Sequence, residues 1–470
     1  LKLEPLQSTP LKPLWLVRMA SKEDIKSDNE TGSGSDGETK EDKSNKMFMQ
    51  EEMESVDKWG AKGVSVDPLM LEGRRANRGF TIAMGKADSS SDCRREKRAQ
   101  TLPSMGSRRG DFALSEASLK LLTERNDLLC QRFRRGSTAV VYAVVPEKEL
   151  NNFWLEHCSC YVCGRMTEGQ SSGDERLRHF GASDHIPGPL PPVVSCTKGS
   201  KGFRDTTPNQ DNFSVAFFKN GFSLVCCMDG HGPFGHMVSS RAVQTVPYYF
   251  MNSQYFPDNV EGALTEAFER AQKDIVASAL QEGWDVQASG STAVAALWNG
   301  STVWTANVGD SRCVIGYESN RKMLFETADH KPNSPPEQAR IEANGGEVRS
   351  QTYPDGWVNH RIFVKGQDFP GLCMTRTLGD ESVKAHGVIA TPEVRKTEVD
   401  LAEKPFLILA SDGVWEFLDS EFVVKAVAKK IQSDGPERTV QKLQREARKR
   451  WRNEEGDYCD DITSVLVQLR

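Results

Sequence analysis

Short apolar runs closed by turns dominate the sequence from Ser195 to the C-terminus. They are rich in Val, Ala, Leu and aromatic residues, which is typical of buried strands. These runs lie at 213–218, 222–228, 291–298, 301–308, 312–317, 404–410 and 462–469. Two longer segments, near 260–280 and 421–452, carry apolar residues at helical spacing. Strand runs with helices grouped between them predict an α+β layered domain rather than alternating βαβ units.

The first part of the chain has a different pattern. Residues 21–46 consist largely of Ser, Asp, Glu, Lys and Gly, which predicts disorder. A helical pattern begins at Leu114, and the proline-rich stretch 184–194 reads as a connector. We therefore expect a disordered charged extension at 1–113, a partly helical lead-in at 114–190 and one main domain at 191–470.

Composition narrows the class of protein. The chain has 60 Lys and Arg against 66 Asp and Glu, a net charge of -6, so no basic excess indicates nucleic-acid binding. No apolar run approaches the ~20 residues of a membrane span. The eleven cysteines are scattered and odd in number, which favours a reduced intracellular protein, cytoplasmic or nuclear, over a disulfide scaffold.

Three closely spaced cysteines in the lead-in leave two interpretations open. Their spacing can begin a zinc site, with a nearby histidine as a further ligand. No second cysteine pair follows at finger-like spacing, which favours an ordinary structural segment. The cysteines are Cys158, Cys160 and Cys163, and the histidines are His157, His179 and His185.

Aspartates recur where the predicted strands begin or end. An Asp beside Gly, Asn or Asp is usually a turn residue or helix cap. Five such positions are harder to explain in that way, because carboxylates gathered at sheet ends repel one another unless a cation neutralises them. Oxygen ligands alone suit Mg²⁺ or Mn²⁺. The positions are Asp211, Asp229, Asp310, Asp412 and the pair Asp460–Asp461.

Ten motifs in the same order give the main domain a family resemblance. They read PNQDNF, MDGHGPFGH, ASGSTAV, NVGDSRCVIG, DHKP, EQARIEANGGEV, MTRTLGD, ATPEV, LASDGVWEFL and DDITSVLV. With these motifs, residues 195–470 resemble the type-2C metal-dependent protein serine/threonine phosphatases. The resemblance implies two antiparallel β-sheets packed as a central sandwich flanked by helices, in four α-β-β-α layers. It also implies a centre of two Mg²⁺ or Mn²⁺ ions between the sheets.

The resemblance assigns roles to the residues of these motifs. Asp229 would bridge both metals, and the Gly230 carbonyl would bind one of them. Asp412 and Asp460 would bind the other, with Asp211 acting nearby. Asp310, together with Asp412, matches a weaker third metal site. His231 would protonate the leaving oxygen as general acid. A capping or core role is its structural alternative, and His236 further along is expected to be structural.

Some positions depart from the family pattern. Gln210 stands where many members have Glu, and Asp461 stands where Asn is common, so both are expected to support the site beside Asp460. The phosphate-binding arginine has no unambiguous match. The candidates are Arg204, which could bind phosphate through two parallel hydrogen bonds, Lys201 and Lys198. Arg376 is expected to be structural, next to a flap within 334–369.

Two functions remain open at this point. One is an active phosphatase acting on phosphoserine and phosphothreonine proteins. The other is a pseudophosphatase that binds a phosphoprotein or acts as a scaffold. Every metal-binding Asp is present, which favours the enzyme. We expect a monomer.

Two short motifs before the main domain match phosphorylation sites. RRGS ends at Ser137 and matches a basophilic kinase site, and RAQTLP around Thr101 resembles a 14-3-3-type docking motif. Phosphorylation would add about -2 charge at Thr101 and could recruit such a partner. An unmodified tail is the alternative.

Overall fold

The computed structural model describes residues 144–167, 169–182, 186, 190–202, 205–353 and 358–470. Several sequence predictions lie outside these residues. They are the extension at 1–113, the helix that begins at Leu114, both phosphorylation sites Thr101 and Ser137, the phosphate-binding candidate Arg204 and the zinc-ligand candidate His185.

Seven strands of the described chain form a large sheet in the order β16-β9-β8-β5-β4-β1-β2, with all neighbours antiparallel. The strands are β1 Cys158–Gly164, β2 Arg178–Gly181, β4 Asn212–Phe218, β5 Ser223–Met228, β8 Ala293–Asn299, β9 Thr302–Val308 and β16 Glu393–Glu398. A second antiparallel sheet has the order β11-β10-β17-β18-β3. Its strands are β3 Val193–Thr197, β10 Arg312–Tyr317, β11 Met323–Glu326, β17 Pro405–Ala410 and β18 Ile462–Gln468.

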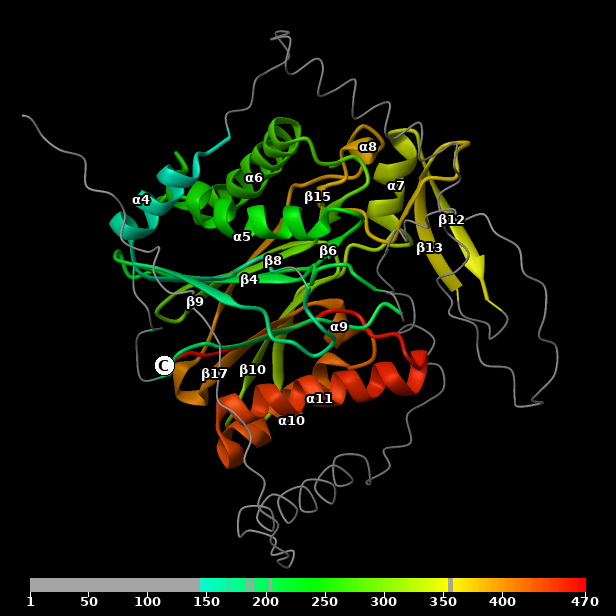
Figure 1. Ribbon diagram of the computed structural model, residues 1–470. Helices are drawn as coiled ribbons and strands as arrows, with labels where there is room; N and C mark the ends of the chain where they lie inside the picture. The colour runs from blue at the N-terminus through cyan, green and yellow to red at the C-terminus, as the bar shows by residue number, and fades with distance from the viewer. Residues whose placement is uncertain (1–143, 168, 183–185, 187–189, 203–204, 354–357) are drawn as a thin grey trace, which may run out of the picture. The chain divides into compact units, whose positions relative to one another are not determined.

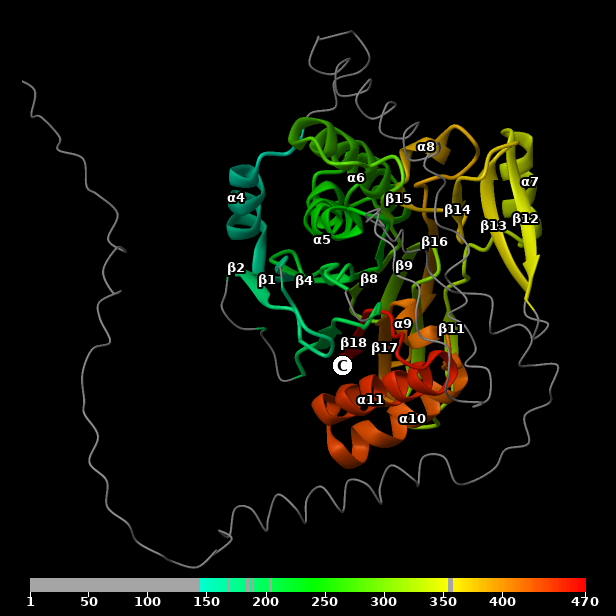
Figure 2. The same ribbon diagram turned by 45° about the vertical axis from the view of Figure 1, so that its right-hand side comes forward.

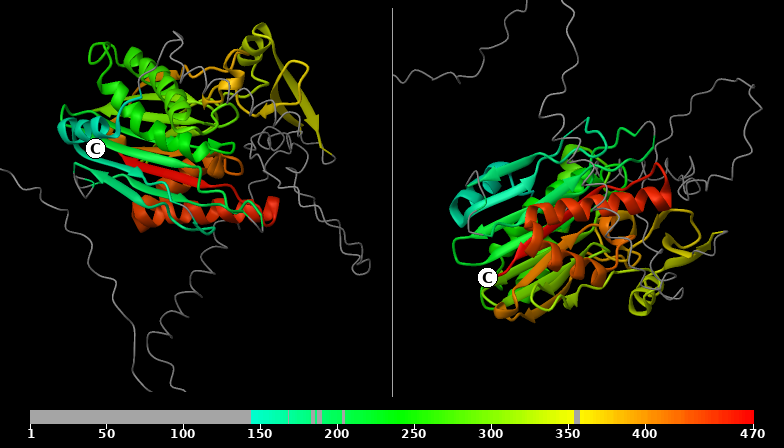
Figure 3. Two further views of the ribbon diagram at one scale, coloured as in Figure 1. Left: turned by 45° about the horizontal axis from the view of Figure 1, so that its top comes forward. Right: turned by 90° about the horizontal axis from the view of Figure 1, so that it is seen from below.

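The two sheets pack face to face, and helices cover their outer faces (Figure 1). Val225 and Val294 of the large sheet share one core with Leu407 and Val465 of the second. Helices α5 Gly235–Met251 and α6 Val260–Glu282 pack on the large sheet, and α10 Ser420–Asp434 and α11 Pro436–Glu455 pack on the second. Figure 3 shows the same layers from two other sides. The predicted four-layer sandwich is confirmed.

Local sequence signals set the ends of the helices. Asn259 caps α6 by accepting the Gly262 N–H at 2.9 Å, and Gly283 ends it with φ +84°. The helical pattern predicted near 421–452 proves to be two helices, because Gly435 takes φ +82° and Pro436 starts a new helix. This break orients α11 separately from α10.

The predicted boundary near residue 190 does not coincide with a break in the fold. Helix α4 Glu147–His157 and strand β1 belong to the predicted lead-in, yet β1 pairs with β4 inside the large sheet. Trp154 stacks on Tyr161, with ring centroids 3.7 Å apart, and the Tyr161 hydroxyl donates to the Val243 carbonyl of α5 at 3.2 Å. The described part of the lead-in is therefore part of the main core.

The three cysteines of the zinc interpretation all lie in β1. Cys158 and Cys163 face the core under the helices, whereas Cys160 faces the core between the sheets. Burial raises the pKa of all three thiols, to about 12 for Cys158 and about 11 for Cys163. Side chains on opposite faces of one strand cannot bind the same ion. The described chain therefore supports the structural interpretation.

Smaller elements lie at one end of the sandwich (Figure 2). The two-residue strands β6 Gly230–His231, β7 Gly290–Ser291 and β15 Leu378–Gly379 form a small sheet, in the order β15-β7-β6. The predicted flap region holds α7 Pro335–Ala343 and the sheet β12-β13-β14, which has its own core with the short helix α8. In this region, β12 is Gly346–Thr352, β13 is Val358–Val364, β14 is Pro370–Leu372 and α8 is Glu381–Lys384. Elsewhere, the 3-10 turn Leu401–Glu403 precedes β17 and the short helix α9 Asp412–Trp415 follows it.

Among the helices that the structure describes, none has both the length and the apolar character needed to cross a membrane.

Candidate metal centre

Strand ends of both sheets bring the predicted aspartates together. In the large sheet, β4 begins where β5 ends, so Asp211 and Asp229 are neighbours on paired strands. In the second sheet, β17 ends beside the beginnings of β10 and β18. Asp310, Asp412 and Asp460 flank those three strand ends. Residues far apart in the sequence thus meet at one end of the sandwich.

The carboxylates are close enough to change one another's protonation. The pKa of Asp229 is raised well above its ordinary value, mainly by burial and then by the charge of Asp412. Burial and the charge of Asp460 raise the pKa of Asp412 in the same way. The pKa of Asp211 rises to about 7 through burial and the charge of Asp461. Concentrated negative charge of this kind attracts cations.

The Asp229–Gly230 turn is held on both sides by backbone contacts. Thr292 fixes Asp229, because its N–H donates to the Asp229 carbonyl at 2.9 Å and its hydroxyl accepts the Asp229 N–H at 3.1 Å. Gly230 donates its N–H to the Gln210 carbonyl at 3.1 Å. A Cβ on Gly230 would collide with the backbone of Gly235 and Gln210, so only glycine fits here.

Asp211 lies next to this turn, and its side chain contacts Ser411. Its Oδ2 accepts a hydrogen bond from the Ser411 hydroxyl at 2.6 Å, and the Ser411 hydroxyl accepts the Thr463 N–H at 3.0 Å. Ser411 directly precedes Asp412, so Asp211 is linked to the turn that carries Asp412. Asp211 therefore supports the turn that carries Asp412, in addition to contributing a carboxylate to the site.

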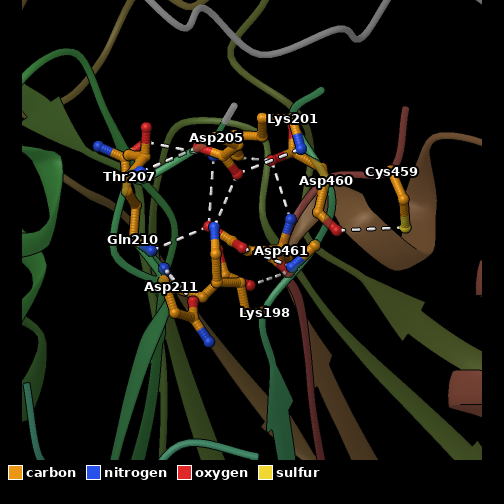
Figure 4. Close-up of polar contacts among 12 residues, drawn as sticks. Lys198, Lys201, Asp205, Thr207, Gln210, Asp211, Cys459, Asp460 and Asp461 are labelled. Carbon is orange, nitrogen blue, oxygen red and sulfur yellow. Dashed lines mark hydrogen bonds and ion pairs between the residues drawn. The ribbon is translucent and has the colours of Figure 1, made fainter. Parts of the chain in front are cut away.

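Asp460 and Asp461 have different surroundings (Figure 4). Both oxygens of Asp461 accept backbone hydrogen bonds, from Gly199 N–H at 2.7 Å and from Gln210 N–H at 2.9 Å. Asp460 Oδ1 lies 3.2 Å from Lys201 Nζ and accepts the Asp461 N–H at 2.9 Å. Asp461 therefore ties the loop at 199–210 to β18, which leaves Asp460 better suited as a ligand.

Gln210 also supports the turn. Its Nε2 donates to the Gly232 carbonyl at 2.6 Å, and its Oε1 accepts from Lys201 Nζ at 3.2 Å. The amide therefore bridges the loop that carries Lys201 and the turn that follows Gly230. An ionised Glu at this position could not donate to a carbonyl.

His231 has a partner that the sequence analysis missed. Its Nε2 lies 2.7 Å from Asp380 Oδ2, and both side chains are buried. Burial acts to raise the pKa of Asp380, but the charge and hydrogen bond of His231, together with Lys384 and Thr377, outweigh it, so this pKa is lowered. A Cβ on Gly290 would collide with both side chains. Asp380 ends the quoted motif MTRTLGD, but nothing in that motif links it to a histidine 149 positions away.

Asp380 has an unusual backbone conformation that its neighbours fix. Its φ and ψ are both 48°, a left-handed conformation that costs a non-glycine residue roughly 1–3 kcal/mol. The Asp380 N–H donates to the Ser289 carbonyl at 2.9 Å. Gln272 of α6 accepts the Gly379 N–H at 2.7 Å and donates to Glu381 at 3.2 Å. These contacts hold Asp380 where it meets His231.

Asp310 contacts a lysine that the sequence analysis also missed. Lys331 Nζ donates to Asp310 Oδ2, and the side chain of Asp310 is only 1% exposed. Asp310 Oδ1 is buried and has no hydrogen-bond partner in the described part of the chain. Lys331 belongs to the motif DHKP just before α7, so it joins this turn to the flap region.

Arg376 has the structural role that was predicted. Its guanidinium forms two hydrogen bonds with Glu337 of α7, at 3.2 and 2.8 Å, and a third with the Thr391 carbonyl at 3.1 Å. These contacts attach the helix of the flap region to the segment before β16. His236 lies in α5, and burial lowers its pKa to about 4.

The donors suit a hard divalent cation. Within the described ranges, no three His, Cys, Asp or Glu side chains already surround one point as a finished metal site. The carboxylates of Asp310 and Asp460 instead contact the ammonium groups of Lys331 and Lys201. Carboxylates whose charges raise one another's pKa, together with the buried Asp310 Oδ1, are what Mg²⁺ or Mn²⁺ requires of a protein.

Comparisons with known proteins agree with this geometry. A family model described as protein phosphatase 2C matches residues 195–455. The chain is 29% identical over 347 residues to the probable protein phosphatase 2C 35 of Arabidopsis thaliana, covering 66% of this chain and 97% of the relative. It is 40% identical over 194 residues to the probable protein phosphatase 2C 12 of Oryza sativa subsp. japonica, covering 40% and 48%.

Solved structures show the same fold. The crystal structure of a serine-threonine phosphatase 2C from Toxoplasma gondii has a TM-score of 0.51 and 20% sequence identity with this chain. The match covers 65% of this chain and all of that one, 100%. At this identity the likeness concerns the arrangement of sheets and helices.

Proposed function

This chain belongs to the protein phosphatase 2C family of metal-dependent protein phosphatases, and we propose that it hydrolyses phosphoserine and phosphothreonine in proteins at a centre of two Mg²⁺ or Mn²⁺ ions. One observation carries the proposal. At adjacent strand ends, Asp412 and Asp460 are buried and Asp229 is half-buried. The charges of Asp412 and Asp460 both raise the pKa of Asp229. Such ions, when bound by these carboxylates, would supply the Lewis-acid chemistry that activates water for displacement at phosphorus.

The residues at these strand ends are the proposed metal ligands. Asp229 would bridge the ions, the Gly230 carbonyl would bind one, and Asp412 and Asp460 would bind the other. Asp211 would act beside them through Ser411, which it contacts at 2.6 Å. Asp310 would contribute to a weaker third site.

His231 is the proposed general acid for the leaving seryl or threonyl oxygen. Its Nε2 is held by Asp380, so its other ring nitrogen, Nδ1, is left for other contacts. Nδ1 is buried and has no hydrogen-bond partner among the described residues. Asp380 is a positioning residue, because it orients the ring without reaching the substrate. The ring then presents a nitrogen that can carry a proton to the leaving group.

The phosphate-binding residue stays a prediction. Lys198 is engaged elsewhere, since its Nζ lies 2.8 Å from Asp205 Oδ2 and its side chain is 4% exposed. Arg204 lies outside the described residues. Arg204 therefore remains the proposed phosphate ligand, because a guanidinium matches two phosphate oxygens at once.

The segment before the described residues keeps its predicted role. A phosphate on Thr101 would recruit a 14-3-3-type partner, and Ser137 is a second candidate site. We also retain the proposal of an intracellular monomer. Kinase treatment of the full chain, followed by measurement of partner binding and turnover, tests this part separately from the catalytic centre.

Hydrolysis of a phosphoserine peptide with added Mn²⁺ tests the catalytic proposal and excludes the pseudophosphatase alternative if turnover is found. Asp229→Asn should lower kcat about 10³-fold, because a charged group aimed at the reacting centre is lost. Asp258→Asn is the matched control, since Asp258 is exposed and distant in sequence from every proposed ligand. Full activity of Asp229→Asn would contradict the proposed centre, and an inactive wild-type chain that binds phosphopeptide would favour the pseudophosphatase.

A further inference from the structure

The Lys201 side chain lies among the proposed ligands and is only 5% exposed. Its Nζ is 3.2 Å from Asp460 Oδ1, 3.3 Å from Asp461 Oδ2 and 3.2 Å from Gln210 Oε1 (Figure 4). The ammonium therefore contacts a proposed metal ligand and two groups that support it. A cation supplied by the chain itself lies on the Asp460 side of the centre.

The backbone on the N-terminal side of Lys201 is fixed. Ser200 exchanges two hydrogen bonds with Cys459, at 2.7 and 2.8 Å, directly before Asp460. Gly199 donates its N–H to Asp461, and a Cβ on Gly199 would collide with the backbone at Asp460. The loop therefore packs closely against the chain that carries Asp460.

Asp205 holds the backbone amide of Lys201 itself. Its Oδ2 accepts the Lys201 N–H at 3.2 Å and the Lys198 ammonium at 2.8 Å, while its Oδ1 accepts the Thr207 N–H at 2.9 Å. Although burial acts to raise the pKa of Asp205, the hydrogen bonds from Lys198 and Thr207 lower it. Two lysines lie three positions apart, but only Lys201 is directed at Asp460.

We propose that Lys201 competes with the divalent cation on the Asp460 side of the centre, so that this position fills only as the cation displaces the ammonium. The inference rests on the proposed function. A positive charge about 3 Å from a ligand oxygen cannot remain beside a divalent ion without strong repulsion. The apparent affinity for the ion is thereby lowered, and occupancy depends on the cation concentration. The chain would thus link its activity to the supply of Mg²⁺ or Mn²⁺.

The main alternative is that Lys201 binds the substrate phosphate. That role and the proposed one predict opposite results when the charge is removed. Loss of a competing cation strengthens binding of a divalent ion, whereas loss of a phosphate ligand leaves ion binding unchanged and weakens phosphate binding. Direct binding measurements separate the two without turnover.

The test is Mn²⁺ binding to the full chain, measured by electron paramagnetic resonance and by titration calorimetry. Lys201→Gln should bind Mn²⁺ at least about tenfold more tightly than wild type, because the repulsion is removed. Lys201→Arg keeps the charge and should remain near the wild-type affinity. Lys198→Gln is the matched control, because it removes a buried ammonium that contacts Asp205 and not Asp460. A thermal melt of each variant establishes that it is folded.

Equal Mn²⁺ affinity of folded Lys201→Gln and wild type would overturn the inference and leave the proposed function intact. The same holds if Lys198→Gln gains as much affinity as Lys201→Gln. Weaker inhibition of Lys201→Gln by inorganic phosphate, with unchanged Mn²⁺ binding, would assign Lys201 to phosphate instead. Failure of wild type and Lys201→Gln alike to bind Mn²⁺ would overturn the metal centre itself.

Discussion

The interior of a strand and the end of a strand give side chains different neighbours, as β1 and the aspartate turns show. Cys158, Cys160 and Cys163 are close in sequence, but the alternation along β1 and its register shift between Cys158 and Cys160 place Cys160 in one core and the others in another. Asp229 and Asp412 are 183 positions apart by their numbering, yet the charge of Asp412 raises the pKa of Asp229. Close spacing in the sequence therefore did not bring the three cysteines together, and wide spacing did not keep the two aspartates apart.

The physical cause is the geometry of a sandwich. Within a strand, successive side chains alternate between faces, and in β1 the register shift between Cys158 and Cys160 interrupts this alternation, so the sheet separates Cys160 from the other two cysteines. At the end of a sheet the alternation stops, and turns from several strands project into the same region. The cysteines are therefore core residues with raised thiol pKa values, and the aspartates form the candidate centre.

Removal of divalent ions should have the largest effect and tests this contrast directly. Chelation with EDTA should reduce phosphopeptide hydrolysis to background, and Mg²⁺ or Mn²⁺ should restore it, because the proposed ligands are all oxygens. The Cys160→Ala variant should show the same dependence on added ions. Full turnover of the chelated enzyme, or loss of the response to Mn²⁺ in Cys160→Ala, would contradict the assignment of the aspartates to the metal centre and of the cysteines to the core.

The second prediction concerns the structural side of the contrast. Trp154→Ala should lower the free energy of unfolding by about 3–5 kcal/mol, because a large buried ring stacked on Tyr161 is lost. Urea denaturation measures the change. Leu155→Ala is the matched control, since Leu155 is 61% exposed and its loss should cost less than about 0.5 kcal/mol.

Mn²⁺ binding by folded Trp154→Ala should match that of wild type, which separates a role in the core from a role in the centre. A Trp154→Ala protein as stable as wild type would mean that α4 and β1 lie outside the cooperative core, and the predicted boundary near residue 190 would then hold.

The third prediction concerns a smaller effect, the loss of catalysis when His231 is replaced. His231→Ala should lower kcat for a phosphoserine peptide by about 10²-fold and for an activated aryl phosphate by less than about tenfold, because a good leaving group needs little proton donation. Asp380→Asn should reproduce this pattern more weakly, since it disturbs the orientation of the ring. Steady-state kinetics on both substrates provide the comparison.

His236→Ala serves as the control for a nearby histidine in α5 and should affect both substrates alike. Losses of equal size on the two substrates for His231→Ala would show that His231 only supports the structure of the turn.

Much of this molecule follows from local sequence. Alternating and continuous apolar runs predict the strands, and the α+β sandwich that they imply is confirmed. The helix predicted near 260–280 is α6, with its cap at Asn259 and its end at Gly283. The oxygen-only chemistry of the candidate centre also follows from residue type, because ligand preference is a property of the side chain.

Tertiary structure alone decided the partnerships. It placed β1 in the large sheet and brought Asp380 to His231 and Lys201 to Asp460. Each of these contacts joins segments that share no local pattern, since hydrogen bonds and ion pairs between distant segments depend on how the sheets stack. Residue type and periodicity therefore determined which chemistry the chain carries, and the packing of the two sheets determined which groups act together.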